Sequence, residues 1–486
     1  MEHSRTAVRR IPTVSLLILL TGALCLACGV RGGGTEAEPL SRGAWTLVSG
    51  SDASNQSGVY GTLGVPAPEN TPGARQWSTS WTDGQGNLWL FGGIGVFPSD
   101  SYTFGYDTGE LNDLWKYEPS TLRWTWVSGA AVPVQEGNYG TRGLPAPDNV
   151  PGARFGAASW TDSSGRLWLF GGRTFGRSLY PMRPAGTFND LWMFDPATLE
   201  WTWISGSSSM DQWGIYGTKG MPAPSSAPGA RTLACAWLGP GDELWLFGGD
   251  GLDAAGNPFQ LNDLWKFDPK TFEWTWISGG ASWDRTSGVY GTRTVPDPAN
   301  VPGGRCWSVS WLDAGGDFWL FGGAGLDSGG RYGYLNDVWK FDPIALEWTW
   351  ISGSNFLDHR GVYGTMGLSA PMNVPRARYA AASWLDSSGN LWVYGGSGYD
   401  SATMTNQYYN DLWKYDPLAN EWTWVSGGDG LGEIGYRPGT PSEEVSPGSI
   451  EGAVSWSGPD GRFWLFGGGR NYEREGLINS LWQYAR

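Results

Sequence analysis

The side chains of this chain offer few routes to covalent or metal chemistry. Its 486 residues include two histidines, His3 and His359, and four cysteines. Copper and zinc sites take several imidazole or thiolate ligands from a clustered set, and no such spacing is present. Any Ser-His-Asp arrangement would depend on His359, yet no serine lies in a nucleophile-elbow motif. We therefore expect no metal, no cofactor and no catalytic residue, and we interpret His359 as a loop residue.

Calcium and disulfide chemistry are also weakly indicated. Asp253 and Asp327 lie in loops where calcium is conceivable, but no full set of oxygen ligands accompanies either residue. Cys235 and Cys306 follow the nearest arginine by four residues and by one residue. Opposite parity along a strand places their side chains on opposite faces. We expect two buried free thiols and no disulfide framework.

Arginines and aspartates recur at matched positions, which leaves two roles open for them. The arginines are Arg75, Arg154, Arg231, Arg305 and Arg378, and the aspartates are Asp113, Asp190, Asp263, Asp337 and Asp411. The arginines could grip a ligand carboxylate, or each could pair with an aspartate. A sixth copy of the pattern has Ile450 and Ser480 instead, so both charges are lost together. Because a lone buried charge is costly, we expect structural ion pairs.

A tyrosine recurs six times in the segments before these arginines. The set is Tyr60, Tyr139, Tyr216, Tyr290, Tyr363 and Tyr436. Such tyrosines could surround a mouth and stack on sugars, or each could pin its loop to the scaffold. A ligand rarely needs six-fold symmetry, so we favour the pinning role.

The elements that position these residues follow from an internal repeat. The pair Gly-Gly recurs after an apolar run at 92, 171, 248, 322, 395 and 467. Each copy divides into four short strands, which in the second copy are Arg154–Trp160, Leu167–Gly171, Asp190–Phe194 and Trp201–Gly206. Turns rich in Asp, Ser, Pro and Gly separate the first strand from the second and the third from the fourth. Six such units in a chain with 76 Gly and 33 Trp predict an all-β, six-bladed β-propeller.

The first strand of each unit has the composition of a strand beside the central axis. Its third and fifth positions after the start are only Ser or Ala, and the opposite face ends in a tryptophan that should fill the core between blades. The last unit ends at Arg486 without a fourth strand, whereas residues 45–50 match the fourth strand of the first unit. We expect this N-terminal strand to complete the last blade, which leaves no free sheet edge in the ring.

These residues resemble the kelch family over residues 45–486. The resemblance rests on Gly-Gly after an apolar strand, then Asn-Asp-Leu-Trp-Lys-Phe-Asp-Pro, then Glu-Trp-Thr-Trp, at kelch-like spacing. It implies a propeller used mostly for binding and names no ligand. The galactose-oxidase type of this propeller implies a copper site with histidine ligands and tyrosines, one of them cross-linked to cysteine. A chain whose histidine outside the leader is His359 alone cannot supply that site.

Six blades with several arginines also resemble sialidase-like glycosidases, in which an arginine triad grips a carboxylate and a tyrosine is the nucleophile. The nearest candidate for the Asp-box of that family is the segment at 82–86, Thr-Asp-Gly-Gln-Gly, whose spacing differs from the family pattern. We keep a glycosidase as the alternative to a non-catalytic binding protein.

Loops alternate sides along an antiparallel blade, so the long connections share one face. The connections from a fourth strand to the next first strand keep a nearly constant length, which predicts a repeated ordered structure. The connections from second to third strands vary in length. The two longest, at 94–111 and 173–188, hold aromatic and arginine side chains. These residues are Phe97, Tyr102, Phe104, Tyr106, Arg173, Phe175, Arg177, Tyr180 and Arg183. We predict that they bind a protein or a glycan, with packing of the loops against the blades as the alternative.

The N-terminus has the pattern of an export signal. Arg5, Arg9 and Arg10 precede the apolar run Val14–Leu24, and Leu-Cys-Leu-Ala-Cys at 24–28 resembles a bacterial lipobox. The resemblance implies lipidation of Cys28, with simple secretion or an uncleaved anchor as alternatives.

Three segments follow from this pattern. We expect a signal peptide at 1–28, a flexible tether at 29–44 and the propeller at 45–486. The leader holds one Glu and three Arg, a net charge of +2, so with a total of −15 the rest of the chain carries −17. That charge argues against nucleic acid as a partner. We expect a monomer that is exported to the cell envelope or secreted, and that touches the membrane only through its lipid.

Overall fold

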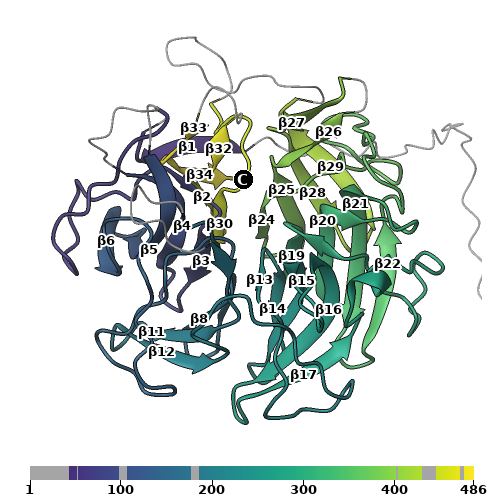
Figure 1. Cartoon of the computed structure of the whole chain (residues 1–486). Coiled ribbons are helices and arrows are strands. Elements are labelled where there is room, and N and C mark those ends of the chain that lie inside the picture. Colours follow the sequence, from purple (N-terminus) through teal and green to yellow (C-terminus); the bar gives the residue numbers. More distant parts are fainter. Residues whose placement is uncertain are drawn as a thin grey trace, which may run out of the picture. The chain divides into compact units, whose positions relative to one another are not determined.

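The computed structural model describes residues 43–51, 53–97, 107–176, 185–400, 403–428, 445–470 and 476–486. Within these ranges the chain is built from strands, with one short 3-10 helix, η1 (Trp283–Arg285). None of the described helical segments is long and apolar enough to cross a membrane. The predicted fold class, an all-β propeller of six blades, is confirmed (Figure 1).

Each blade is an antiparallel sheet whose four main strands are named from the axis outwards. Blade 1 has β3 (Thr79–Thr82), β4 (Leu88–Phe97), β5 (Asp107–Glu118) and β6 (Arg123–Ser128). Blade 2 has β7 (Ala158–Thr161), β8 (Leu167–Phe170), β11 (Leu191–Asp195) and β12 (Glu200–Ser205). Blade 3 has β14 (Cys235–Leu238), β15 (Leu244–Leu252), β16 (Pro258–Asp268) and β17 (Glu273–Ser278). Blade 4 has β19 (Val309–Leu312), β20 (Phe318–Leu326), β21 (Tyr332–Asp342) and β22 (Glu347–Ser352).

Blades 5 and 6 follow the same plan. Blade 5 has β24 (Ala382–Leu385), β25 (Leu391–Tyr394), β28 (Leu412–Asp416) and β29 (Glu421–Ser426). Blade 6 has β30 (Val454–Ser457), β31 (Phe463–Phe466), β34 (Leu481–Ala485) and β1 (Ala44–Ser49). Short strands extend the blades: β2 (Arg75–Gln76), β13 (Arg231–Thr232), β18 (Arg305–Cys306) and β23 (Ser369–Ala370). Three two-stranded ribbons pair β9 (Arg173–Thr174) with β10 (Gly186–Thr187), β26 (Ser397–Asp400) with β27 (Thr405–Tyr408), and β32 (Gly469–Arg470) with β33 (Gly476–Leu477).

The six innermost strands form a closed ring. β3 contacts β7, β7 contacts β14, and the contacts continue through β19, β24 and β30 back to β3. The N-terminal strand closes the ring as predicted, because β1 pairs antiparallel with β34 in blade 6. In this pairing Trp45 lies opposite Tyr484. The first and last strands of the described chain therefore share one sheet.

Tryptophans of the innermost strands fill the space between blades, as their parity predicted. The set is Trp81, Trp160, Trp237, Trp311, Trp384 and Trp456, all buried. The indole nitrogen of Trp81 donates to the carbonyl of Trp168 in the next blade at 2.9 Å. Trp456 donates to the carbonyl of Trp89 at 3.2 Å, which joins blade 6 to blade 1. Burial of each large apolar side chain contributes about 1.5–3 kcal/mol, so these contacts hold adjacent blades together.

The Gly-Gly pairs are explained by a close approach between neighbouring blades. Gly92 and Gly93 have φ values of 61° and 93°, and the N–H of Gly93 donates to the carbonyl of Arg154 in blade 2 at 2.9 Å. A Cβ atom at position 92 would lie 2.6 Å from that carbonyl oxygen. No other residue fits this backbone geometry, which accounts for the repetition of the pair.

The first strand of each unit is interrupted, and in this respect the predicted strand Arg154–Trp160 was wrong. The second residue after each arginine, or after Ile450 in blade 6, has a positive φ of 53–66°. These residues are Trp77, Gly156, Leu233, Trp307, Ala380 and Gly452. A left-handed residue breaks the pleat, so only residues 158–161 form the inner strand of blade 2. The other three strands predicted for this blade are each within one residue of the observed bounds.

The loops of constant length cover the outer strands. Ala67 bridges Trp124 in blade 1, and equivalent bridges join Ala146 to Trp201 and Ala223 to Trp274. Asp297 bridges Trp348 in blade 4, and β23 pairs with β29 in blade 5. The prediction of a repeated ordered structure in these loops is confirmed. They protect five sheet edges that would otherwise be free to pair with another chain.

Candidate functional site

The recurrent arginines and aspartates form five equivalent buried ion pairs. In blade 1 the two Nη atoms of Arg75 donate to the two carboxylate oxygens of Asp113, each at 2.7 Å. Arg75 also donates to the carbonyls of Gly73 and Gly92, each at 3.1 Å. The other pairs are Arg154–Asp190, Arg231–Asp263, Arg305–Asp337 and Arg378–Asp411. These guanidinium groups are buried and already bound, so they are not available as a triad for a ligand carboxylate.

The recurrent tyrosines pin loops to these ion pairs. The Tyr60 hydroxyl donates to Asp113 at 2.7 Å, and its ring packs against Trp115 and Trp126. The same contact joins Tyr139, Tyr216, Tyr290 and Tyr363 to the aspartates of blades 2 to 5. Burial, together with the Asp113 charge, raises the pKa of Tyr60, so its hydroxyl remains a donor. Five of the six tyrosines therefore have the pinning role, and Tyr436 lies outside the described residues.

The remaining residues with possible chemistry are also held by local contacts. His359 accepts a hydrogen bond through Nδ1 from the N–H of Gly361 at 3.0 Å, and burial lowers its pKa. Asp253 caps its own loop by accepting from the N–H groups of Ala255 and Asn257, both at 2.8 Å. Asp327 does the same in blade 4, where it accepts from Arg331. Among the residues that the structure describes, no group of three His, Cys, Asp or Glu is arranged to hold a metal ion.

Cys235 and Cys306, which lie in the described part of the chain, are buried free thiols, as predicted. Burial raises the pKa of Cys235 to about 12 and that of Cys306 well above its usual range. A thiol with such a pKa stays protonated and is a poor nucleophile.

A closed circle of backbone hydrogen bonds surrounds the axis at the six left-handed residues. Each donates its N–H to the carbonyl of the equivalent residue in the preceding blade. The bonds run from Trp77 to Gly452, from Gly156 to Trp77 and from Leu233 to Gly156, at 2.8, 2.9 and 2.6 Å. They continue from Trp307 to Leu233, from Ala380 to Trp307 and from Gly452 to Ala380, at 3.2, 3.1 and 2.9 Å. A positive φ turns these amide groups along the circle. The hydrogen bonds of the circle therefore explain why residues such as Trp adopt a backbone conformation that is rare for them.

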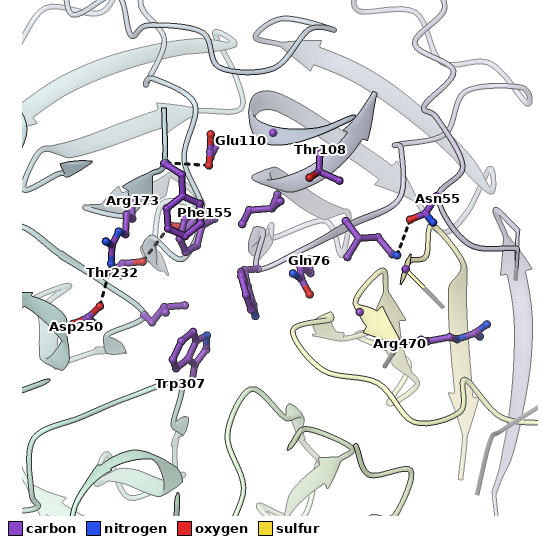
Figure 2. Close-up of a pocket in the computed structure, with 18 of the residues that line it drawn as sticks. Asn55, Gln76, Thr108, Glu110, Phe155, Arg173, Thr232, Asp250, Trp307 and Arg470 are labelled. Carbon is purple, nitrogen blue, oxygen red and sulfur yellow. Dashed lines mark hydrogen bonds and ion pairs between the residues drawn. The ribbon is translucent and has the colours of Figure 1, made fainter. Parts of the chain in front are cut away.

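A pocket of about 600 Å³ lies at this end of the axis, and we call it the axial pocket. All six blades contribute to its wall. Gln76 comes from blade 1, Phe155 from blade 2, Thr232 from blade 3 and Trp307 from blade 4, while blade 5 adds Tyr408 and blade 6 adds Arg470. Figure 2 shows side chains from different strands around one central space. The connections between second and third strands lead into its rim, so it opens on the face that carries the long loops.

Aromatic rings form a continuous array across the axial pocket. Trp77 and Trp307 belong to opposite blades, and their ring centroids are 5.9 Å apart. Trp77 contacts Phe155 at 5.6 Å, and Phe155 contacts Phe175 at 5.0 Å. On the other side Trp307 contacts Tyr379 at 5.5 Å. The array gives the pocket an aromatic floor that spans the axis.

Charged groups around the axial pocket are bonded to one another or to the backbone. Arg173 lies 3.3 Å from the carboxylate of Asp250, and its guanidinium stacks on Phe175 at 5.3 Å. Burial raises the pKa of Asp250, although Arg173 opposes that effect. The buried Glu110 accepts from the N–H of Phe175 at 3.0 Å, and Arg470 donates to the carbonyl of Pro447 at 3.1 Å.

Glu451 is a buried acid next to Gly452 of the backbone circle. Its side chain is 1% exposed, and neither carboxylate oxygen makes a hydrogen bond within the described part of the chain. Burial raises the pKa of Glu451, and the neighbouring hydroxyls of Ser397 and Tyr379 offset only part of this effect.

The structure brings two of the predicted binding residues to the axial pocket. Arg173 and Phe175 line it, whereas Phe97 lies at the end of β4 and is not among the lining residues. The other predicted positions, Tyr102, Phe104, Tyr106, Arg177, Tyr180 and Arg183, lie outside the described residues, as does Cys28.

The aromatic floor was missed by the sequence analysis, although a signal for it exists. The two positions after each strand-1 arginine read Gln-Trp, Phe-Gly, Thr-Leu, Cys-Trp, Tyr-Ala and, after Ile450, Glu-Gly. They lie between an arginine kept in five copies and a position that is always Ser or Ala. Variation that is confined to two positions of an otherwise regular strand indicates a surface where the repeats differ in function.

One comparison with known proteins bears on this arrangement. Residues 138–352 match the family model described as the KLHDC2/KLHL20/DRC7 Kelch-repeats domain. The matched stretch contains blades 2, 3 and 4 and the loop that leads into blade 2.

Proposed function

We propose that this kelch-repeat β-propeller is a non-catalytic binding protein of the cell envelope, whose ligand, a glycan or a protein, binds at the axial pocket on the long-loop face. The observation that carries the proposal is the concentration of unlike side chains in the pocket. The ion pairs, pinning tyrosines and inter-blade tryptophans repeat from blade to blade, whereas the pocket lining differs in every blade. A repeated scaffold that carries a pocket with an unlike lining from each blade is the arrangement of a binding module.

The proposed site of action rests on the N-terminal pattern. Residues 1–28 would direct export, and lipidation of Cys28 would hold the propeller at the membrane surface through the segment at 29–44. Mass spectrometry of the chain purified from a bacterial membrane fraction tests this part. A mature N-terminus at an acylated Cys28 supports it, and an unprocessed or unacylated chain contradicts it.

Binding at the axial pocket is tested with variants of its rim. We expect Arg173→Ala with Phe175→Ala to abolish capture of ligands from a glycan array and from solubilised envelope proteins. The matched control is Ile344→Ala with Leu418→Ala, two exposed residues in turns between third and fourth strands, on the other face of the blades. The proposal fails if folded rim variants keep every ligand that the wild type captures.

A further inference from the structure

We infer that the axial pocket binds a neutral saccharide of one or two rings, with a sugar face stacked on Trp307 and the tilted ring of Trp77 beside it, at an interplanar angle of 48°. This inference rests on the proposed binding function and names the ligand class. Its first support is the shape of the site. The lining residues come from six blades around one axis, so the pocket is bounded by all the blades and does not run along a single sheet edge. A volume of about 600 Å³ is within the range of pockets that hold small ligands, whereas an extended peptide needs a groove or a sheet edge.

The second support is the fixed orientation of the aromatic floor. Trp77 and Trp307 have φ values of 56° and 54°, and the N–H and C=O groups of both belong to the closed hydrogen-bond circle. Gly452 leaves room for Trp77, because a Cβ atom there would lie 2.5 Å from its indole ring. Both residues are intermediate in exposure, although the indole nitrogen of each is buried. Flat aromatic surfaces that are held in place before binding suit the apolar face of a pyranose ring, since little entropy is lost when the ligand stacks.

The third support is the charge of the lining. Four charged side chains line the described part of the pocket, and each has a partner: Arg173 with Asp250, Glu110 with the backbone of Phe175, and Arg470 with the backbone of Pro447. The two arginines (+2) and the two acids (−2) sum to a formal charge of zero, so the lining offers a charged ligand no net attraction. Uncharged polar groups, among them Gln76 and Tyr408, also face the pocket. Amide and hydroxyl groups both donate and accept, as sugar hydroxyls do, so the lining suits a neutral polyhydroxylated ligand.

The test uses the full chain and sugars of matched size that differ in charge. Glucose, galactose, mannose, N-acetylglucosamine and their disaccharides are the neutral probes, and glucuronic acid and glucosamine are the charged ones. We expect saturation-transfer NMR and titration calorimetry to detect at least one neutral sugar. The charged sugars should bind about tenfold more weakly, or not detectably, because they lose hydration of their charge in a pocket whose described lining has no net charge.

Variants of the floor separate stacking from folding. Trp307→Leu should weaken binding of the neutral sugar about tenfold, a loss of about 1.4 kcal/mol, because the stacked ring is removed, whereas Trp307→Phe should stay within about threefold of the wild type. Trp213→Leu is the matched control, since Trp213 is 61% exposed and lies in a loop outside the pocket lining. If Trp307→Leu does not fold, Phe175→Ala at the rim replaces it, with the same expected direction.

The inference and the proposed function fail in different ways. If no neutral sugar binds but a peptide or a charged sugar binds and is lost in the Arg173 and Phe175 variants, the inference is overturned and the proposed function stands. Binding of a neutral sugar that is unchanged in the folded Trp307→Leu and Phe175→Ala variants also overturns the inference. If no ligand of any class depends on the pocket, both are overturned.

Discussion

Trp77 in blade 1 and Trp307 in blade 4 meet across the propeller axis with their ring centroids 5.9 Å apart. Both are left-handed residues whose backbone groups take part in one hydrogen-bond circle. The circle fixes the backbone positions of the two tryptophans, and the contact between their indole rings closes the floor of the axial pocket. A change at any of its six positions should therefore affect blade packing and pocket shape together.

Gly452→Ala should destabilise the propeller and disturb Trp77. The residue has a φ of 64°, and a Cβ atom would lie 2.5 Å from the indole ring. Backbone strain costs about 1 kcal/mol, and the steric contact should add about 1–3 kcal/mol. Gly143→Ala is the control, because Gly143 has a φ of 77° with open space around it. The difference between the free energies of unfolding of the two variants, measured by chemical denaturation, gives the effect of the contact with Trp77. Equal losses in the two variants would contradict the predicted role of Trp77.

Replacing one member of a buried ion pair should lower the free energy of unfolding more than replacing both members. Arg154→Ile leaves the Asp190 carboxylate buried without its partner, which should lower the free energy of unfolding by about 3–5 kcal/mol. The double variant Arg154→Ile with Asp190→Ser copies the Ile450 and Ser480 of blade 6 and should recover part of that loss. Denaturant unfolding of the single and double variants measures the difference. A double variant less stable than Arg154→Ile would show that the pair itself, and not the unpaired charge, dominates.

Tyr216→Phe should loosen one loop without unfolding the blade. The variant removes a hydrogen bond of 2.6 Å from the hydroxyl to Asp263 and keeps the ring packed against Trp265 and Trp276. A hydrogen bond to a charged group is worth about 1.5–3 kcal/mol, so the free energy of unfolding should fall by about that amount. Hydrogen exchange should quicken in the loop at 207–230. The exposed Tyr332→Phe is the control, and an equal effect there would refute the pinning role.

Glu451→Gln should change how stability depends on pH. Because burial raises the pKa of Glu451 in the folded state, folding favours its protonated form. The contribution of Glu451 to the free energy of unfolding is therefore fully present below the pKa that this residue has in the unfolded chain. It is lost as the pH rises through the pKa that Glu451 has in the folded protein. We expect Glu451→Gln to match the wild type in acid and to become the more stable protein towards neutral and alkaline pH. Thermal unfolding from about pH 4 to about pH 9 tests this, and parallel pH profiles for the two proteins would contradict it.

The repeat alone was sufficient to predict the architecture. Each unit carries its own signals, namely Gly-Gly, the turn residues and an inner strand with Ser or Ala on one face and Trp on the other. Blade number, closure by residues 45–50 and the pairing of Arg154 with Asp190 follow from where such signals recur, because local backbone and packing rules act within or between adjacent strands.

The axial pocket could not be predicted in this way, and the physical reason is its geometry. Its floor joins Trp77 and Trp307, which are 230 positions apart in the sequence and belong to opposite blades. Strand periodicity assigns Trp77 and Phe155 to continuous strands. The positive φ of Trp77 and of Gly156 breaks these strands where six blades close the hydrogen-bond circle, and both side chains then line one shared space. The sequence by itself determined the scaffold, and Arg173 and Phe175 were two of the nine binding positions that it predicted. The tertiary structure alone decided which unlike residues meet on the axis, because that meeting depends on the ring being closed.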